Sequence, residues 1–222
     1  MSTIPVIAID GPSASGKGTV AQRAALQLGF HYLDSGALYR LTALAAHKSG
    51  VPLDDEVALA ALAAALKLEF ADDKIFLGGE DVSDAIRTEA VADGASRAAV
   101  LPRVREALLA RQRAFRAAPG LVADGRDMGS IVFPDADLKI FLTATAEVRA
   151  ERRYKQLKEK GMYVSLEDIL QEIRSRDARD ASRSVAPLQL LPGAELLDTS
   201  NLTIDEAVDR VLHWYAAKDI GA

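Results

Sequence analysis

Short apolar runs alternate with longer amphipathic segments along much of this chain. Five runs are predicted to form strands, at residues 6–9, 30–33, 121–123, 138–142 and 195–199. A strand inside a parallel sheet is covered on both faces, so it tends to be apolar throughout rather than at alternate positions. The pattern therefore predicts an α/β fold with a five-stranded parallel sheet flanked by helices.

The segments between these strands carry helix signals at their ends. Gly29 is expected to end a first helix near Leu28, and Asp34 or Ser35 can cap a second helix that runs to about Ser49. Further helices are expected at residues 102–116, at 147–160, after a cap at Ser165, and from a Thr203–Glu206 capping box to about Ala217.

The alternation of strand and helix is interrupted in the first half of the chain. The elements expected there are a helix at 52–66, hairpin strands at 67–71 and 74–77 around Asp72-Asp73, a closing turn at 78–79, and a helix at 88–99. We interpret residues 57–101 as an inserted small α/β lobe. The core is then formed by residues 1–56 and 102–222.

A glycine-rich stretch, GPSASGKGT, directly follows the first strand and precedes the first helix. Gly11, four residues and then Gly16-Lys17 match the start of the P-loop pattern, in which backbone N–H groups surround phosphate oxygens. A plain turn is the alternative, but the strand, the spacing, the lysine and the helix all agree with phosphate binding. Gly18 stands where a Ser or Thr usually holds magnesium, so direct metal ligation by the loop is not expected.

Other charged residues follow predicted strands or gather on one predicted helix. Ser35 and Arg40 begin the second helix and are compatible with a second phosphate site, although a plain cap and a surface arginine would look the same. Asp124, Arg126 and Asp127 follow the third strand, at the sheet edge where ligands of parallel sheets gather. An acidic residue there is also suited to orienting nucleotide-bound magnesium.

The helix after Ser165 carries several arginines, among them Arg176, Arg179 and Arg183, with Asp177 and Asp180 between them. A run of charges usually marks a solvated helix face. As part of a mobile arm, however, the same run would bring arginines over a transferring phosphoryl group.

Composition narrows the class of protein. The chain has 222 residues, a net charge of -5 and no cysteine, which excludes disulfides, a thiol nucleophile and cysteine metal sites. An acidic chain is not expected to bind nucleic acid over a broad surface. Arginine outnumbers lysine by eighteen to nine, and its planar guanidinium suits bidentate phosphate recognition. The histidines, His31, His47 and His213, have no ligand spacing and are expected to be structural.

The apolar pattern also bears on location and assembly. No window approaches a membrane span, and no basic region precedes a long apolar stretch, so we expect a cytoplasmic protein without membrane contact. No exposed apolar stripe of the coiled-coil type is evident, so a monomer is expected. Two phosphate sites and an arginine-rich arm together predict phosphoryl transfer, in which positioning and charge neutralisation supply most of the catalysis.

Several motifs, in this order, resemble those of the bacterial cytidylate kinases: GPSASGKGT, LDSGALYR, PRVREALLARQRAF, ADGRDMGSIVFPDA and RDARDASRSVAPL. The resemblance covers nearly the whole chain. It implies a P-loop NTPase fold and the activity of this nucleoside monophosphate kinase family, transfer of the terminal phosphoryl group of ATP to CMP or dCMP. It also implies that residues 57–101 are a monophosphate-binding lobe, that about 153–170 form a lid, and that Mg²⁺ is carried by ATP rather than by the chain.

The resemblance further implies roles for individual residues. The ATP phosphates would be wrapped by Gly11, Pro12, Ser13, Ala14, Ser15, Gly16, Lys17, Gly18 and Thr19, with Lys17 bridging donor and transferred group. CMP would be bound by Ser35, Arg40, Ser96, Arg105, Asp127, Arg176, Asp180 and Arg183. Among these, Arg40 would contact the phosphate of CMP, and Asp180 and Arg183 would contact its sugar and phosphate. The cytosine would be read by Ser96, Arg105 and Asp127. Arg176 and Arg179 would neutralise the transition state.

The chemistry of the base supports one of these roles directly. A carboxylate at Asp127 can accept a hydrogen bond from the exocyclic amine that cytosine has and uracil lacks. Two alternatives stay open at this point. One is another small-molecule kinase of the same class, such as a UMP/CMP, adenylate or shikimate kinase, and the other is a non-catalytic nucleotide-binding switch.

Overall fold

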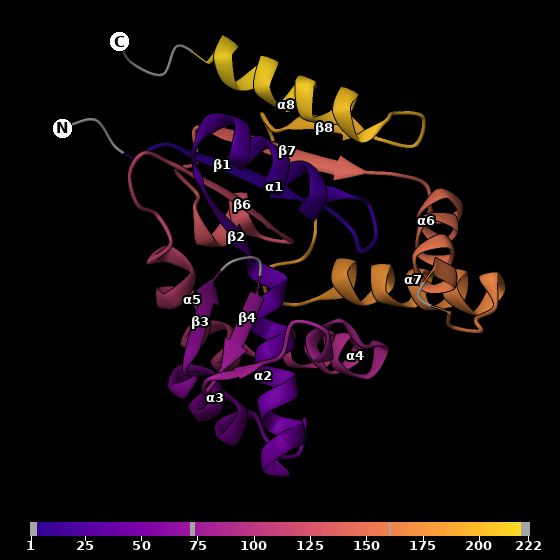
Figure 1. Cartoon of the computed structure of the whole chain (residues 1–222). Coiled ribbons are helices and arrows are strands. Elements are labelled where there is room, and N and C mark those ends of the chain that lie inside the picture. Colours follow the sequence, from indigo (N-terminus) through magenta and orange to yellow (C-terminus); the bar gives the residue numbers. More distant parts are fainter. Residues whose placement is uncertain (1–3, 72–73, 160, 219–222) are drawn as a thin grey trace. The chain divides into compact units, whose positions relative to one another are not determined.

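A computed structural model describes residues 4–71, 74–159 and 161–218 (Figure 1). The chain divides into two compact units. The core unit comprises Met1–Leu33 and Phe115–Ala222, and the insert unit comprises Asp34–Ala114. The lobe expected at residues 57–101 lies within the insert unit, which extends beyond it at both ends.

The core unit is built on a five-stranded sheet with the strand order β2-β6-β1-β7-β8. The strands are β1 (Val6–Asp10), β2 (His31–Asp34), β6 (Leu121–Gly125), β7 (Leu138–Thr143) and β8 (Glu195–Asp198). The pairs β1–β6, β1–β7 and β7–β8 are parallel. Every residue of β1 and β6 is buried, as their continuous apolar sequences predict. The predicted five-stranded α/β sheet is confirmed.

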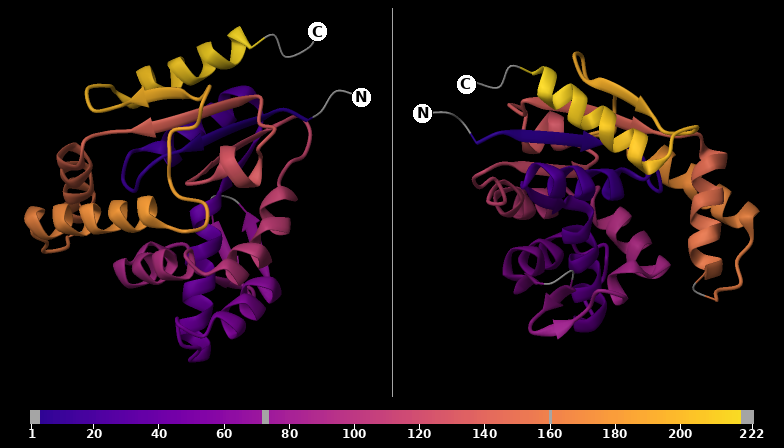
Figure 2. Two further views of the ribbon diagram at one scale, coloured as in Figure 1. Left: turned by 180° about the vertical axis from the view of Figure 1, so that it is seen from behind. Right: turned by 45° about the horizontal axis from the view of Figure 1, so that its top comes forward.

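Helices cover this sheet because their apolar faces need a partner. The helices of the core unit are α1 (Lys17–Leu28), α6 (Ala146–Glu159), α7 (Leu166–Ser182) and α8 (Ile204–Ala217). Small residues of α1 and Ala207, Val208 and Val211 of α8 form one buried cluster with Ile7 and Ile9 of β1. Figure 2 shows α8, in yellow, lying along the sheet in both views.

A second, smaller apolar cluster joins α6 to α7. Ala150 and Leu157 of α6 are buried against Ile169 and Ile173 of α7, and Ala14 of the glycine-rich loop packs against the same cluster. The loop after β1 is therefore in contact with α6 and α7, the second of which carries Arg176 and Arg179.

The insert unit consists of four main helices and a small antiparallel sheet. Its elements are α2 (Ser35–Ser49), α3 (Glu56–Ala65), β3 (Leu68–Ala71), β4 (Lys74–Leu77), β5 (Glu80–Asp81), the short η1 (Ala85–Arg87), α4 (Glu89–Ala98) and α5 (Pro102–Arg113). Helix α2 packs against α4, and α3 packs against α5. The three strands follow one another in the order β3-β4-β5.

Several boundaries differ from those predicted, each for a local reason. The helix expected from Pro52 begins only at Glu56, because the Asp55 side chain accepts from the Ala58 amide and caps it there. Gly78-Gly79 does not close a two-stranded hairpin. With φ angles of 60° and 87° these glycines turn the chain into a third strand, β5.

The turn after β6 was not predicted, and one predicted helix ends earlier than expected. The segment after the DGRD sequence forms a single π turn, η2 (Met128–Val132), which no periodicity signals. The helix expected at 102–116 ends at Arg113. The hairpin turn at Asp72-Asp73 and the predicted helix end at Lys160 fall outside the described residues.

Candidate active site

The glycine-rich loop connects β1 to α1 in the geometry that an anion site requires. A Cβ atom on Gly11 would lie 2.0 Å from the Leu142 carbonyl oxygen, so the chain can pass β7 here only as glycine. Gly16 caps α1 with a φ of 88° and offers no side chain to its first amides. Those amides and the positive end of the helix dipole are thus available to phosphate oxygens.

Two serine hydroxyls inside the loop reinforce this interpretation. Ser13 and Ser15 are buried, and within the described part of the chain their Oγ atoms have no hydrogen-bond partner. A buried polar atom without a partner costs free energy, and such atoms commonly await a ligand or water. The loop therefore combines backbone donors with hydroxyls that a bound phosphate would satisfy.

Lys17 lies beside this loop rather than pointing into solvent. Its Nζ donates to the Pro12 carbonyl oxygen at 3.3 Å and lies 4.0 Å from Asp124 Oδ1. Asp124 follows the apolar part of β6 and is buried, and it accepts a hydrogen bond of 2.7 Å from the Tyr32 hydroxyl. The lysine predicted to contact the transferred phosphoryl group is held close to the loop by a buried carboxylate.

Two arginines of α6 hold the loop from outside, although the sequence suggested only a charged helix there. Arg149 Nη1 donates to the Ser13 carbonyl oxygen at 3.1 Å, and Arg152 Nη1 donates to the Ser15 carbonyl oxygen at 3.3 Å. Thr199, just after β8, donates from Oγ1 to the same Ser15 oxygen at 3.2 Å. Two side chains of α6 and one from the segment after β8 therefore fix the carbonyls of the loop, leaving its amides to face a ligand.

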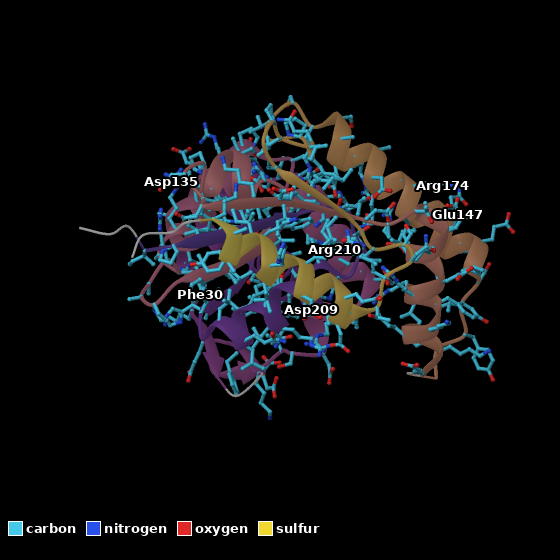
Figure 3. All side chains as sticks on the ribbon, turned by 90° about the horizontal axis from the view of Figure 1, so that it is seen from above. Phe30, Asp135, Glu147, Arg174, Asp209 and Arg210 are labelled. Atoms are coloured by element: carbon cyan, nitrogen blue, oxygen red, sulfur yellow. The ribbon has the colours of Figure 1, made fainter. Side chains whose placement is uncertain are left out.

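Arg149 also connects this loop to α7. Its guanidinium donates to both carboxylate oxygens of Asp177, at 3.0 and 2.5 Å, in the bidentate geometry typical of strong arginine–carboxylate pairs. Asp177 lies between Arg176 and Arg179 in the sequence. A more exposed pair, Arg174 on α7 with Glu147 on α6 at 2.9 Å, joins the same helices (Figure 3).

A second charged network joins the end of α7 to the loop after β6. Asp180 is buried and accepts a 2.6 Å hydrogen bond from Arg126 Nε and another from Arg183 Nη2. Burial alone would raise the pKa of Asp180, but the positive charges of Arg126 and Arg183 outweigh it and lower the pKa below its usual value. This carboxylate is therefore ionised at neutral pH and fixes both arginines.

In the insert unit the predicted residues Ser35 and Arg40 each have a specific side-chain partner. Gln112, fully buried on α5, donates from Nε2 to Ser35 Oγ at 3.0 Å. Arg40 pairs at 2.5 Å with Asp34, whose other carboxylate oxygen caps α2. These contacts show that Ser35 is not the cap residue of α2, since Asp34 accepts from the Ala37 amide.

Ser96 and Arg105 complete the set of predicted residues in the insert unit. Arg105 is buried on α5 and donates to the Ala99 carbonyl oxygen at 3.2 Å. Ser96 Oγ is buried, and no described residue provides it with a hydrogen-bond partner. A buried arginine and an unsatisfied hydroxyl are unusual features for a merely structural helix pair.

Comparison with known proteins decides among the kinases that share such a loop. A sequence model of the family described as cytidylate kinase matches residues 7–217. The chain is 62% identical to the cytidylate kinase of Chromobacterium violaceum over 216 residues, covering 97% of both chains. It is 56% identical over 217 residues to that of Cupriavidus necator, covering 98% of both chains.

This chain belongs to the cytidylate kinase family. The resemblance found in the motifs is thereby confirmed. Solved structures are more distant. A gluconokinase from Sinorhizobium meliloti matches with a TM-score of 0.48 and 17% identity over 98% of this chain and 94% of its own, a likeness that does not bear on function.

Kinases of this family use a nucleotide, generally with Mg²⁺. Gly18 contributes no hydroxyl after Lys17, and among the described residues no group of three or more histidine, aspartate or glutamate side chains is arranged to hold a metal. Asp124, however, places one buried carboxylate beside Lys17. One or two carboxylates together with phosphates and water are the usual environment of Mg²⁺ at such sites.

The site as a whole was found only in part from the sequence. The core unit carries residues 11–19, Asp127, Arg176, Arg179, Asp180 and Arg183, and the insert unit carries the remaining predicted residues. The assigned ligand contacts of these residues stay predictions. The residues not singled out as loop or site supports are Arg149, Arg152, Thr199, Asp177 and Gln112. Thr199 stands at the end of the last predicted strand, where a side chain reaches the ligand edge of the sheet.

No helix in the ranges 4–71, 74–159 and 161–218 is both long enough and apolar enough to cross a membrane.

Proposed function

We propose that this protein transfers the terminal phosphoryl group of ATP to CMP or dCMP, giving ADP and CDP or dCDP in pyrimidine nucleotide metabolism. The observation that carries the proposal is the 62% identity to a cytidylate kinase across 97% of both chains. The alternatives left open by the motifs, a different nucleotide kinase and a non-catalytic switch, find no comparable support.

Donor binding is assigned to the glycine-rich loop. Residues 11–19 bind the ATP phosphates through the amides at the start of α1 and through the Ser13 and Ser15 hydroxyls. Lys17 is proposed to bridge the donor and the transferred phosphoryl group. Its position beside the loop, 4.0 Å from the Asp124 carboxylate, supports this. Mg²⁺, carried by ATP, supplies charge neutralisation on the donor phosphates.

Acceptor binding is assigned to polar and charged side chains. We propose that Arg40 binds the phosphate of CMP and Ser35 lies beside it. Ser96, Arg105 and Asp127 bind cytosine, and Arg183 binds the sugar and phosphate together with Asp180. The Ser96 hydroxyl, which no described residue satisfies, supports its role because a buried polar group needs a partner. The burial of Arg105 and Asp127 supports theirs because charged side chains are rarely buried without a specific reason.

Catalysis by this arrangement requires no dedicated general base. Phosphoryl transfer has a loose transition state, and its acceleration comes from aligning the two nucleotides and stabilising charge on the equatorial oxygens. Arg176 and Arg179 are the arginines we assign to this charge, with Arg176 also contacting CMP. Residues 153–170, at the turn between α6 and α7, are proposed to act as a lid that excludes water from the reaction.

We infer a cytoplasmic monomer that uses only small-molecule partners, ATP and CMP or dCMP. The net charge of -5 supports the absence of a broad nucleic-acid surface.

A substrate panel tests the reaction directly. ADP release from Mg-ATP is measured with CMP, dCMP, UMP, AMP and GMP supplied separately, together with an acceptor-free control. ADP formation confined to CMP and dCMP is the expected result. Activity with another acceptor would retain a kinase and reject the cytosine assignment, whereas no activity with any acceptor would favour the nucleotide-binding switch.

Base recognition is tested by removing one carboxylate. Asp127→Ala is expected to lower the preference for CMP over UMP by about 1–3 kcal/mol, the usual worth of a good base-edge contact. The measurement is kcat/KM for both nucleotides, with Asp54→Ala, an exposed position of the insert unit, as the control. An unchanged preference in Asp127→Ala would show that another group reads the base.

A further inference from the structure

Asp10 is a buried carboxylate that the proposed mechanism does not use. It is the last residue of β1 and immediately precedes Gly11 of the glycine-rich loop. Its Oδ1 accepts from the Met128 amide at 2.8 Å and its Oδ2 accepts from the Gly129 amide at 2.9 Å. Both oxygens are thus committed to the first amides of η2, and the residue is directed at the backbone rather than at a ligand.

The chain around these contacts encloses the residue proposed to read the base. Asp10 is in register with Gly125 in the β1–β6 pair, and the Gly11 amide donates to the Gly125 carbonyl oxygen at 3.3 Å. The segment after β6 is therefore attached to the end of β1 at Gly125 and again at residues 128–129. Asp127 lies between the two attachments.

Asp127 has a backbone that needs such support. Its φ of -148° and ψ of 24° belong to neither helix nor strand. Its carbonyl oxygen accepts from the Ile131 and Val132 amides, at 2.9 and 3.2 Å, and so begins the π turn. A residue that lies between a strand and an irregular turn has no regular ladder to fix its direction, so the position of its side chain depends on the groups that hold η2.

We propose that Asp10 is a positioning residue that fixes Asp127 for recognition of the acceptor base. The inference rests on the proposed function, in which Asp127 distinguishes cytosine from uracil. A carboxylate suits this task because it is an acceptor at both oxygens, whereas an amide of the same shape presents one acceptor and one donor. Asp10 also adjoins the donor loop, so the two substrate-binding segments share one anchor.

The electrostatics agree with a functional rather than a stabilising role. Burial raises the pKa of Asp10 to about 7, against the lowering effect of the Gly129 and Met128 amides. The neighbouring charges are Asp127, which raises this pKa further, and Arg126, which lowers it. Burying an ionised aspartate costs free energy, so the presence of Asp10 here is best explained by the geometry that its two hydrogen bonds impose.

The central test is Asp10→Asn. The amide retains the shape, but its NH₂ group faces one of the two backbone amides and one hydrogen bond is lost. The ratio of kcat/KM for CMP to that for UMP is expected to fall roughly 3- to 10-fold, the effect of losing one ordinary intramolecular hydrogen bond. KM for ATP is expected to change less than KM for CMP, which a general loss of structure would not produce.

Asp137→Asn is the matched control. Asp137 accepts from the Val6 amide at 2.7 Å, so it makes the same kind of contact with the same strand, but at the opposite end of β1. Its substitution is expected to leave the CMP to UMP ratio unchanged. An equal fall in both variants, or an unchanged ratio in Asp10→Asn, would overturn the proposal.

A double-mutant cycle separates an action through Asp127 from an independent one. In the Asp127→Ala background, adding Asp10→Asn is expected to change the ratio no further. A second fall of the same size would overturn the proposal, because it would show that Asp10 acts on specificity without Asp127.

A pH series measures the CMP to UMP ratio of the wild-type protein, so this test does not depend on whether a variant folds. The ratio is expected to rise between pH 6 and 8 as Asp10 loses its proton and accepts from both amides. Titration of the nucleotide phosphate affects kcat/KM for CMP and for UMP alike, so it does not change their ratio. A ratio independent of pH, or one that depends on pH equally in wild type and Asp10→Asn, would overturn the proposal. A wild type without any preference for CMP would instead refute the proposed function, and this inference with it.

Discussion

The two glycines at either end of the phosphate-binding loop are expected to respond in opposite ways to the same added methyl group. At Gly11, a Cβ atom would lie 2.0 Å from the carbonyl oxygen of Leu142 and 3.0 Å from its carbonyl carbon. Non-bonded heavy atoms are in favourable contact at about 3.5 Å, so the distance between the added Cβ and the carbonyl oxygen is too short by more than an ångström. Both partners are backbone, one in the loop and one in the central strand β7, and neither has a side-chain rotamer that relieves it.

Gly11→Ala is therefore expected to destabilise the core unit by about 3 kcal/mol or more, the upper part of the range for overpacked interiors. For a chain of this size that corresponds to a fall of roughly 6–12 °C in Tm. Displacement of the loop by about 1 Å is also expected to reduce kcat roughly 100-fold, because phosphoryl transfer depends on alignment.

Gly18→Ala serves as the comparison within the same loop. Its Cβ would meet the Tyr32 hydroxyl at 3.5 Å and Asp124 at 3.7 Å, which are ordinary contacts, and Gly18 lies in the first turn of α1. Its Tm is expected to equal that of wild type or to rise by up to about 4 °C, since alanine is the better helix former. Thermal melts followed by circular dichroism, with kcat at saturating substrates, measure both effects. A wild-type Tm for Gly11→Ala would refute the steric argument.

Three further predictions concern charged groups. Lys17→Ala is expected to lower kcat at least 100-fold with little change in Tm, because the lysine is not part of the core; steady-state rates and a melt check this, and a normal rate would remove Lys17 from the mechanism. Asp177→Asn leaves the buried guanidinium of Arg149 without its counter-charge and is expected to cost about 1–3 kcal/mol in urea unfolding. Glu147→Gln removes an exposed pair between the same helices and should cost less, so equal effects would contradict the burial argument. The pKa of Asp10 is raised from 3.8 to about 7 in the folded state, so protonation of Asp10 stabilises the fold fully below pH 4, and this stabilisation is lost as the pH rises through 7. The free energy of unfolding of wild type relative to Asp10→Asn should therefore fall by about 3 kcal/mol between pH 5 and 8. A constant difference would show that the pKa is not raised.

The strands and most helix ends were predictable because their causes are local. Continuous apolar runs specify β1 and β6, and a Thr203–Glu206 capping box specifies the start of α8, where both reciprocal hydrogen bonds are present. Gly29 ends α1 with a φ of 66°, as expected of a glycine at that position. Each signal involves residues within a few positions of one another, so a single sequence contains all the information.

The boundary errors have the same local origin but involve competing signals. The alanine-rich run from Pro52 favours helix throughout, yet Asp55 determines where the helix begins because its side chain satisfies the Ala58 amide. Gly78-Gly79 signals a turn but does not show whether the chain continues as a strand beyond it. The two-residue strand β5 is too short to show any alternation of apolar and polar positions.

The phosphate-binding loop and the DGRD sequence were recognisable from the sequence by themselves, because residue type and spacing carry the chemistry of each motif. The supports of these motifs were not recognisable. Arg149 reaches the Ser13 carbonyl oxygen across 136 positions, and Asp10 reaches the Gly129 amide across 119. In the sequence Arg149 lies in the helix predicted at 147–160, and Asp10 directly follows the strand predicted at 6–9. Only the parallel order of β6, β1 and β7 brings their carboxyl ends together, and with them the side chains that hold the loop in place.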